Sequence, residues 1–230
     1  MYKFNFPILS IINSKLIVFT DGFGDFVEKL PIYLKYLIVS FLVICFLLPG
    51  IKSIPPLDRD EARFSQASKQ MLEDQNYVVI KFQDELRAKK PIGIYWVQSL
   101  SAYIFGKESI TSYRIPNVIA FITLTLVFST FVYNIAYRYF DVAFSTAINY
   151  SLLTSILLSI IFGFAIEIKQ AKTDSILLML CTIQQLIFWK IYNYGKESWN
   201  IYKHNDHAWL VRLFWFILAL GILIKGPISP

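Results

Sequence analysis

Long apolar runs alternate with short polar stretches along most of the chain, and one polar stretch is much longer than the others. A helix needs about 20 mostly apolar residues to cross a hydrocarbon core about 30 Å thick. The runs that approach this length lie at 32–51, 115–137, 143–165, 175–194 and 209–224. The pattern therefore predicts an all-α integral membrane protein with about five transmembrane helices.

The segments between these spans are expected to lie at the two membrane faces. Segment 1–31 contains an apolar stretch that is too short to span, so we expect it to be cytoplasmic and interfacial. Lysines in 1–31 and around 195–208 favour the cytoplasm for both, although the lysines of 169–172 and of 52–114 point the other way. This orientation predicts that the long segment 52–114 is an outer, periplasmic loop.

The long outer loop has its own helical and extended patterns. Pro55 and Pro56 end the first span, and Asp58 or Asp60 can cap a helix that continues to Leu72. Residues 77–82 are apolar and β-branched enough to be extended, whereas 91–105 are rich in Ile, Tyr, Trp and Phe. We therefore expect two interfacial helices, lying on the membrane surface, with an extended piece between them.

Composition and charge narrow the class of protein further. The chain is 56% hydrophobic and has a mean hydropathy of +0.51, which is unusual for a soluble domain. Its two cysteines, Cys45 and Cys181, fall inside predicted spans and are interpreted as buried fillers and not as a disulfide. The net charge of +6 comes without a basic stripe among aromatics, which argues against nucleic acid and favours anionic membrane lipids or a lipid phosphate as partners.

Three carboxylates are candidates for chemistry. Asp60 and Glu61 are predicted at the start of the first interfacial helix, where a carboxylate can act as a base or hold a divalent metal. Helix capping and ordinary surface pairing explain the same positions, and spacing alone favours that explanation. Asp174 lies at the mouth of the fourth span, where an ionisable group must be solvated, paired or used; Lys172 is a candidate partner.

Some lysine, glycine and histidine residues give weaker indications of binding sites. Lys89 and Lys90, followed by aromatic residues, are typical of a lipid-phosphate site and equally of a generic anchoring belt. The glycines of 22–24 lack the third glycine and preceding strand of a dinucleotide loop. His204 and His207 have a spacing that a metal can use, but in a short polar connection a solvated pair is favoured.

Four blocks of sequence carry a resemblance to a known family. They are PPLDRDEARFSQASKQML, AKKPIGIYWVQSLSAYIFG, AKTDSILLM and GILIKGP. Together they resemble, in order and spacing from about Leu48 to the last residue, the amino-terminal part of the aminoarabinose transferases. These enzymes are akin to the protein O-mannosyltransferases and share the membrane glycosyltransferase fold called GT-C. The resemblance implies a partial GT-C fold.

The resemblance also implies an activity. Such enzymes transfer a sugar from a polyprenyl-phosphate donor to an acceptor, a lipid A-like glycolipid or a protein, with inversion, at the outer face of the cell inner (cytoplasmic) membrane. By matched position, Asp60 and Glu61 form the acidic pair at the catalytic centre, and Asp174 is a second acidic residue on the outer side. Family members differ over a divalent metal, so no metal is certain and Asp60 is its possible ligand.

The same resemblance assigns the carrier phosphate to basic residues. Arg63 follows the acidic pair, and Lys90 matches the lysine before the family's proline, with Lys89 beside it. A phosphate leaving group needs cations against its developing charge, and an incoming hydroxyl needs a base nearby. The basic residues supply the positive charge, and the acidic pair Asp60 and Glu61 supplies the negative charge.

The chain is less than half the usual length of the family, which keeps three interpretations open. It can be a truncated or split transferase that works with a second chain supplying the missing carboxy-terminal half. Alternatively, it is a non-catalytic membrane remnant or subunit that binds lipid phosphate or a partner chain, so its status as an enzyme is uncertain. A small transporter or channel is disfavoured because the predicted spans hold few polar residues.

Overall fold

The computed structural model describes residues 30–56, 58–87, 89–140, 142–197 and 208–227. The interfacial stretch predicted within 1–31, the glycines of 22–24, and His204 and His207 lie outside these residues, as does most of the predicted 195–208 loop. Everything below concerns the described part of the chain.

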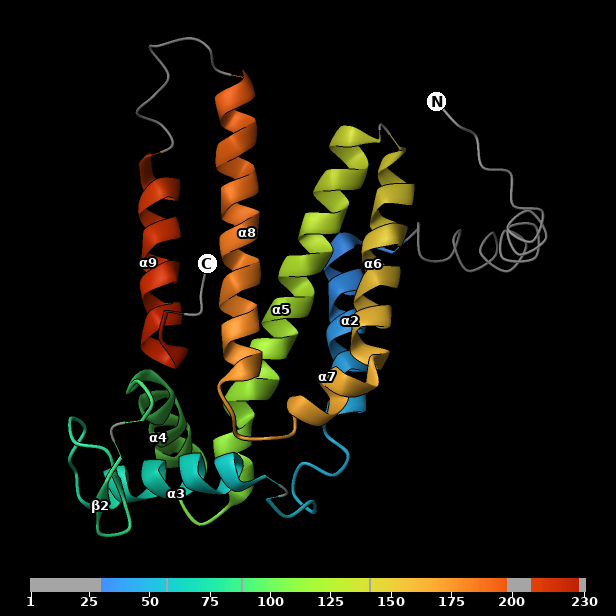
Figure 1. Ribbon diagram of the computed structural model, residues 1–230. Coiled ribbons are helices and arrows are strands. Elements are labelled where there is room, and N and C mark those ends of the chain that lie inside the picture. The colour runs from blue at the N-terminus through green and yellow to red at the C-terminus, as the bar shows by residue number, and fades with distance from the viewer. Residues whose placement is uncertain (1–29, 57, 88, 141, 198–207, 228–230) are drawn as a thin grey trace.

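Five apolar helices stand side by side as the main body of the molecule (Figure 1). Three of them, at Ile110–Arg138, Asp174–Asn193 and Ala208–Lys225, are long and apolar enough to cross a membrane, and two more apolar helices are shorter. The full helices are α2 (Ile32–Leu47), α5 (Ile110–Tyr139), α6 (Phe144–Ile160), α8 (Asp174–Glu197) and α9 (Ala208–Lys225). The predicted class, a helical protein with several membrane-spanning helices, is confirmed.

The third apolar run differs in shape from a single span. α6 ends at Ile160 because Ile161 adopts an extended conformation, and the chain then forms the short helix α7 (Phe162–Glu167). α7 leaves the direction of α6 and leads into the 168–173 turn below α8 (Figure 1). This turn therefore lies beside the long polar segment.

The long polar segment forms a layer across one end of the helices (Figure 1). Helix α3 (Arg59–Glu73) begins where the Asp58 side chain accepts a hydrogen bond from the Asp60 N–H at 3.0 Å. A small antiparallel hairpin, β1 (Lys81–Phe82) and β2 (Glu85–Leu86), then leads to α4 (Gly93–Phe105). The two predicted helices of this segment are both present, and the extended piece is confined to the hairpin.

Two close contacts join α4, in this layer, to the long helices α9 and α5. A Cβ on Gly93 would lie 2.6 Å from the carbonyl oxygen of Leu223, so the start of α4 reaches α9 only because Gly93 has no side chain. Inside α5, Pro116 has no N–H to donate to the carbonyl of Ser112; the hydroxyl of Ser101 donates to that carbonyl instead, at 2.6 Å. In each contact α4 meets a backbone carbonyl of a long helix, that of Leu223 in α9 or that of Ser112 in α5.

Candidate active site

A buried ion pair joins the start of α3 to the start of α5. The side chains of Glu61 and Arg114 are both fully buried, and the guanidinium donates to the two carboxylate oxygens from Nε at 2.7 Å and Nη2 at 3.1 Å. Arg114 also donates from Nη1 to the carbonyls of Ile51 and Ile54, both at 2.7 Å. Such a bidentate pair, with two further guanidinium donors bonded to carbonyls, satisfies two charges in the interior.

The same carboxylate helps to hold the turn before α8. The backbone N–H of Ala171 donates to Glu61 Oε1 at 2.9 Å, and the carbonyl of Ala171 accepts from the buried Gln98 at 3.0 Å. The neighbouring carbonyl of Gln170 accepts from Asn117. Side chains from α3, α4 and α5 therefore fix residues 170–171 in space. Glu61 lies within this framework, and its predicted part in catalysis stays a prediction.

The turn held in this way carries two further ion pairs. Lys172 contacts Asp58 at 2.5 Å and Glu167 at 3.7 Å, while Asp174, the first residue of α8, pairs with Lys225 at the end of α9. The hydrogen bond from Lys172, together with that from the Asp60 N–H, lowers the pKa of Asp58. The considered pairing of Lys172 with Asp174 is wrong, because each residue has a different ionic partner.

Asp60 differs from its acidic neighbours. It is the second residue of α3 and half-buried, and within the described residues its carboxylate has no hydrogen-bond or ion-pair partner. It lies close enough to Tyr95 to contribute to the raised pKa of that phenol, although burial of Tyr95 is the larger cause. Of the three predicted acidic residues, Asp60 is therefore the one whose oxygens are available to a substrate.

The predicted phosphate-binding residues come from two segments of the same layer, α3 and the residues just before α4. Arg63 is half-buried one turn after Asp60, whereas Lys90 is half-buried and Lys89 exposed just before α4. Pro91 is next to Lys90, and its Cγ lies 3.9 Å from the point where a Cβ on Gly226 would be. This segment therefore meets the end of α9. Their binding of a phosphate stays a prediction.

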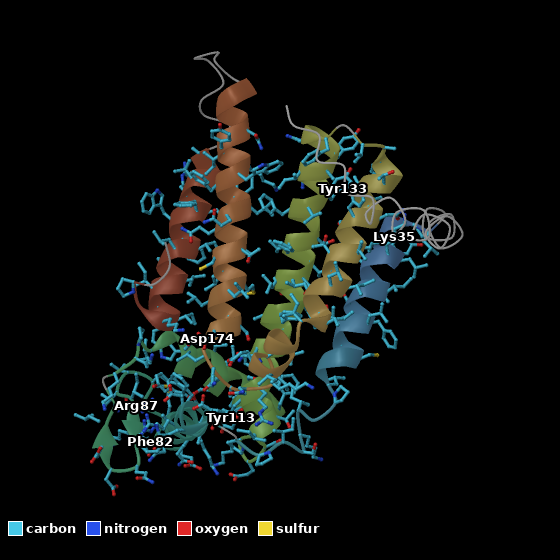
Figure 2. The ribbon with its side chains drawn as sticks, turned by 45° about the vertical axis from the view of Figure 1, so that its right-hand side comes forward. Lys35, Phe82, Arg87, Tyr113, Tyr133 and Asp174 are labelled. Carbon is cyan, nitrogen blue, oxygen red and sulfur yellow. The ribbon has the colours of Figure 1, made fainter. Side chains whose placement is uncertain are left out.

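One basic residue that sequence reasoning did not single out is held firmly in the same layer. Arg87 follows the hairpin, its guanidinium lies over the rings of Phe64 (5.6 Å) and Phe82 (5.9 Å), and its Nε donates to Tyr95 Oη at 2.9 Å. Figure 2 shows Arg87 beside Phe82 at the end of the molecule where Asp174 also lies. Its three aromatic partners belong to α3, the hairpin and α4, and only the fold brings these elements around one guanidinium.

Arg114 was also missed as a site-building residue. In the sequence it marked only the border of an uncharged run, and its partner Glu61 lies 53 positions away. The one available signal was its position at the boundary of a span, where a charge must find a partner.

An apolar cavity of about 520 Å³ opens beside this polar layer. It lies between α4, α5, α8 and α9, and its lining includes Trp96, Leu100, Ile119, Met179 and Leu223. Its walls are suited to hydrocarbon and not to a charged group. Within the described residues, no three His, Cys, Asp or Glu side chains gather to hold a metal ion.

Comparison with known proteins first places the chain in a structural class. Its fold matches part of ArnT from Cupriavidus metallidurans, solved both in the apo state and bound to undecaprenyl phosphate. Each match has a TM-score of 0.64 and 16% identity, and covers 84% of this chain and 32% of ArnT. The chain therefore has part of the GT-C fold.

Sequence relatives specify the likeness further. The chain is 27% identical over 105 residues to the undecaprenyl phosphate-alpha-4-amino-4-deoxy-L-arabinose arabinosyl transferase of Shewanella sediminis, and 34% identical over 73 residues to that of Yersinia pestis. It spans 18% and 13% of those relatives, and no protein-family model matches it. The chain is an integral membrane protein similar to aminoarabinose transferases over part of their length.

Proposed function

We propose that this chain takes part in transferring a sugar from a polyprenyl-phosphate donor to an acceptor at the outer face of the cytoplasmic membrane. The observation that carries the proposal is Asp60, a carboxylate with no partner among the described residues, in a polar layer that also contains Arg63, Lys89 and Lys90 and lies beside an apolar cavity. The partial likeness to aminoarabinose transferases supports the same chemistry. The acceptor is a glycolipid of the lipid A kind or a protein.

The proposed transfer step is a single displacement at the anomeric carbon. An acceptor oxygen forms the new bond to that carbon while the bond to the carrier phosphate breaks, and the phosphate leaves with the electron pair. Where the acceptor is a hydroxyl, its proton passes to Asp60; where it is a phosphate, Asp60 orients it. Arg63, Lys89 and Lys90 stabilise the negative charge that develops on the leaving phosphate.

The remaining acidic residues serve this step indirectly. Glu61, with Arg114, fixes the start of α3 and therefore Asp60. Asp174 keeps Lys225 at the edge of the layer. Hydrocarbon of the carrier fits the apolar cavity between α4 and α9, because its lining offers almost no polar atoms.

Transfer in membranes tests the proposal. The chain is expressed in membranes that lack an endogenous transferase of this class, a radiolabelled polyprenyl-phosphate sugar is added, and label in the lipid and protein fractions is measured. Wild type is compared with Asp60→Asn and Lys90→Ala, and with Lys107→Gln as a control at the far rim of the layer. We expect Asp60→Asn to reduce transfer by about 10²-fold or more, as for loss of a general base.

Two outcomes would change the conclusion. Transfer that survives Asp60→Asn would remove Asp60 from the catalytic step. No transfer by wild type, with donor still bound, would favour the alternative function, a non-catalytic membrane component that binds lipid phosphate or a partner chain.

A further inference from the structure

Arg87 is held in one orientation by contacts on three sides. Phe64 lies on α3, Phe82 on the hairpin and Tyr95 on α4, and the guanidinium touches all three. Phe64 and Tyr95 also pack against each other, with ring centroids 5.6 Å apart, and both are almost completely buried. A guanidinium fixed in this way loses little side-chain freedom when a ligand binds.

These contacts leave hydrogen-bond donors unused. Nε of Arg87 is the nitrogen that bonds to Tyr95, so the two terminal nitrogens keep their N–H groups. Tyr95 Oη accepts in that bond, and its own O–H therefore has to donate elsewhere. Within the described residues neither group has an acceptor, although Tyr95 has 0% exposure.

Other cations of the layer lack this combination. Lys69, Lys107, Lys172 and Lys225 each contact a carboxylate, and Arg114 bonds to Glu61 and to two carbonyls. Lys89 and Arg63 have no such carboxylate among the described residues, and within those residues no hydrogen bond or ring contact fixes the charged end of either. Arg87 alone among these residues is both oriented and without a carboxylate.

We propose that Arg87 and Tyr95 together bind the phosphate oxygens of the carrier lipid. The terminal nitrogens of a guanidinium form a planar fork that matches two oxygens of a phosphate, and a phenol O–H can donate to a third. Asp60 lies one helical turn before Phe64, whose ring packs against Tyr95, so a phosphate held here is bound on the same part of the layer as the candidate base. The inference rests on the proposed function and names residues of the same site.

Binding of a short carrier tests this assignment. The full chain is placed in phosphatidylcholine nanodiscs and titrated calorimetrically with farnesyl phosphate, with farnesol and with inorganic phosphate. We expect Arg87→Gln to weaken farnesyl phosphate binding by about tenfold to a hundredfold, as for loss of a charge-assisted hydrogen bond. Arg87→Lys keeps the charge and loses the fork, so its affinity should fall between wild type and Arg87→Gln.

Tyr95→Phe and Lys81→Gln separate the specific contacts from general charge. Tyr95→Phe keeps the ring against Phe64 and is expected to weaken binding by about threefold to tenfold. Lys81→Gln removes one positive charge from the same hairpin, where Lys81 is exposed and pairs with Asp74 at 3.6 Å, and should leave affinity unchanged. Circular dichroism confirms that each variant keeps its helices.

The outcomes distinguish this inference from the proposed function. Farnesyl phosphate binding that is equal in Arg87→Gln and Lys81→Gln would overturn the inference and leave the proposed function standing. Equal affinity of wild type for farnesyl phosphate and inorganic phosphate would overturn the assignment to a lipid-linked phosphate. Equal affinity for farnesyl phosphate and farnesol would overturn both the inference and the donor class.

Discussion

Buried polar side chains are used differently in the polar layer and in the membrane helices. In α5 and α6, the hydroxyls of Thr125, Ser155 and Ser159 each donate to the carbonyl four residues earlier in their own helix. In the layer, Glu61 bonds to residues 53 and 110 positions away, and Gln98 to one 73 positions away. A hydroxyl in a helix can be satisfied locally, whereas the carboxylate and amide of the layer join separate segments.

The relative positions of the helices depend more on the polar layer than on the lipid-facing surfaces. Helices that face lipid gain little specificity from apolar contact, because lipid is as apolar as leucine. The layer, by contrast, joins the end of α2, α3, α4, α5 and the turn before α8 through buried polar bonds. Substitutions in the layer should therefore have larger effects than comparable substitutions within the spans.

The largest effect is expected at the buried ion pair. Arg114→Gln leaves Glu61 without its cation and two carbonyls without a donor, and should lower the free energy of unfolding by about 3–5 kcal/mol. Thermal unfolding in detergent, followed by circular dichroism, measures this loss. The exposed pair of Lys107 and Glu73 is the control, and a loss in Arg114→Gln no larger than in Lys107→Gln would contradict the comparison.

A glycine substitution tests the contact of α4 with α9. Gly93→Ala places a methyl group against the backbone carbonyl of Leu223 and should destabilise the fold by about 1–3 kcal/mol. Gly163→Ala in α7 is the matched control, since no atom lies within 4 Å of its Cβ position. Equal unfolding temperatures for the two variants would show that the close approach of α4 to α9 is not needed.

Two serine substitutions compare the regions directly. Ser101→Ala removes the hydroxyl that donates to the carbonyl of Ser112, to which Pro116 has no N–H to donate, and should lower the free energy of unfolding by about 1–2 kcal/mol. Ser155→Ala removes a hydroxyl that bonds to its own helix, and should cost less than about 0.5 kcal/mol. Unfolding midpoints measured side by side check the order, and a larger loss for Ser155→Ala would reverse it.

The smallest effect is expected from the partly exposed pair of Asp58 and Lys172. Because the pKa of Asp58 is lowered in the folded state, its contribution is present above its ordinary value of 3.8 and is lost as the pH falls through the lower folded value. Asp58→Asn keeps a capping side chain and removes the charge. The unfolding temperature of wild type should therefore fall more than that of the variant when the pH is lowered from about 5 to about 3.

Equal acid sensitivity in the two proteins would contradict this expectation. Glu108 offers a second comparison, because its carboxylate pairs with Lys69 and its pKa is also lowered. The variant Glu108→Gln is measured over the same pH range.

Much of the fold could be predicted from local pattern. The apolar runs predicted the membrane helices, and the proline pair and Asp58 predicted the start of α3. The break of the third run at Ile161 could not be read, because no proline or charge marks it. Within the candidate site, Asp60 was selected because it matches the acidic pair of the family that the sequence resembles, whereas its lack of a partner among the described residues became visible only in the folded chain.

What the sequence alone determined is the membrane class, the long polar segment and the residue types available for chemistry, since these follow from local hydropathy and capping. Only the tertiary structure decided which charges neutralise one another: Arg114 pairs with Glu61, Lys225 with Asp174 and Lys172 with Asp58. These pairs join residues 51 to 114 positions apart, so no local pattern encodes them. Asp60 and Arg87 are set apart from these acids and bases because, among the described residues, the packing of α3, α4 and the hairpin gave neither an ionic partner.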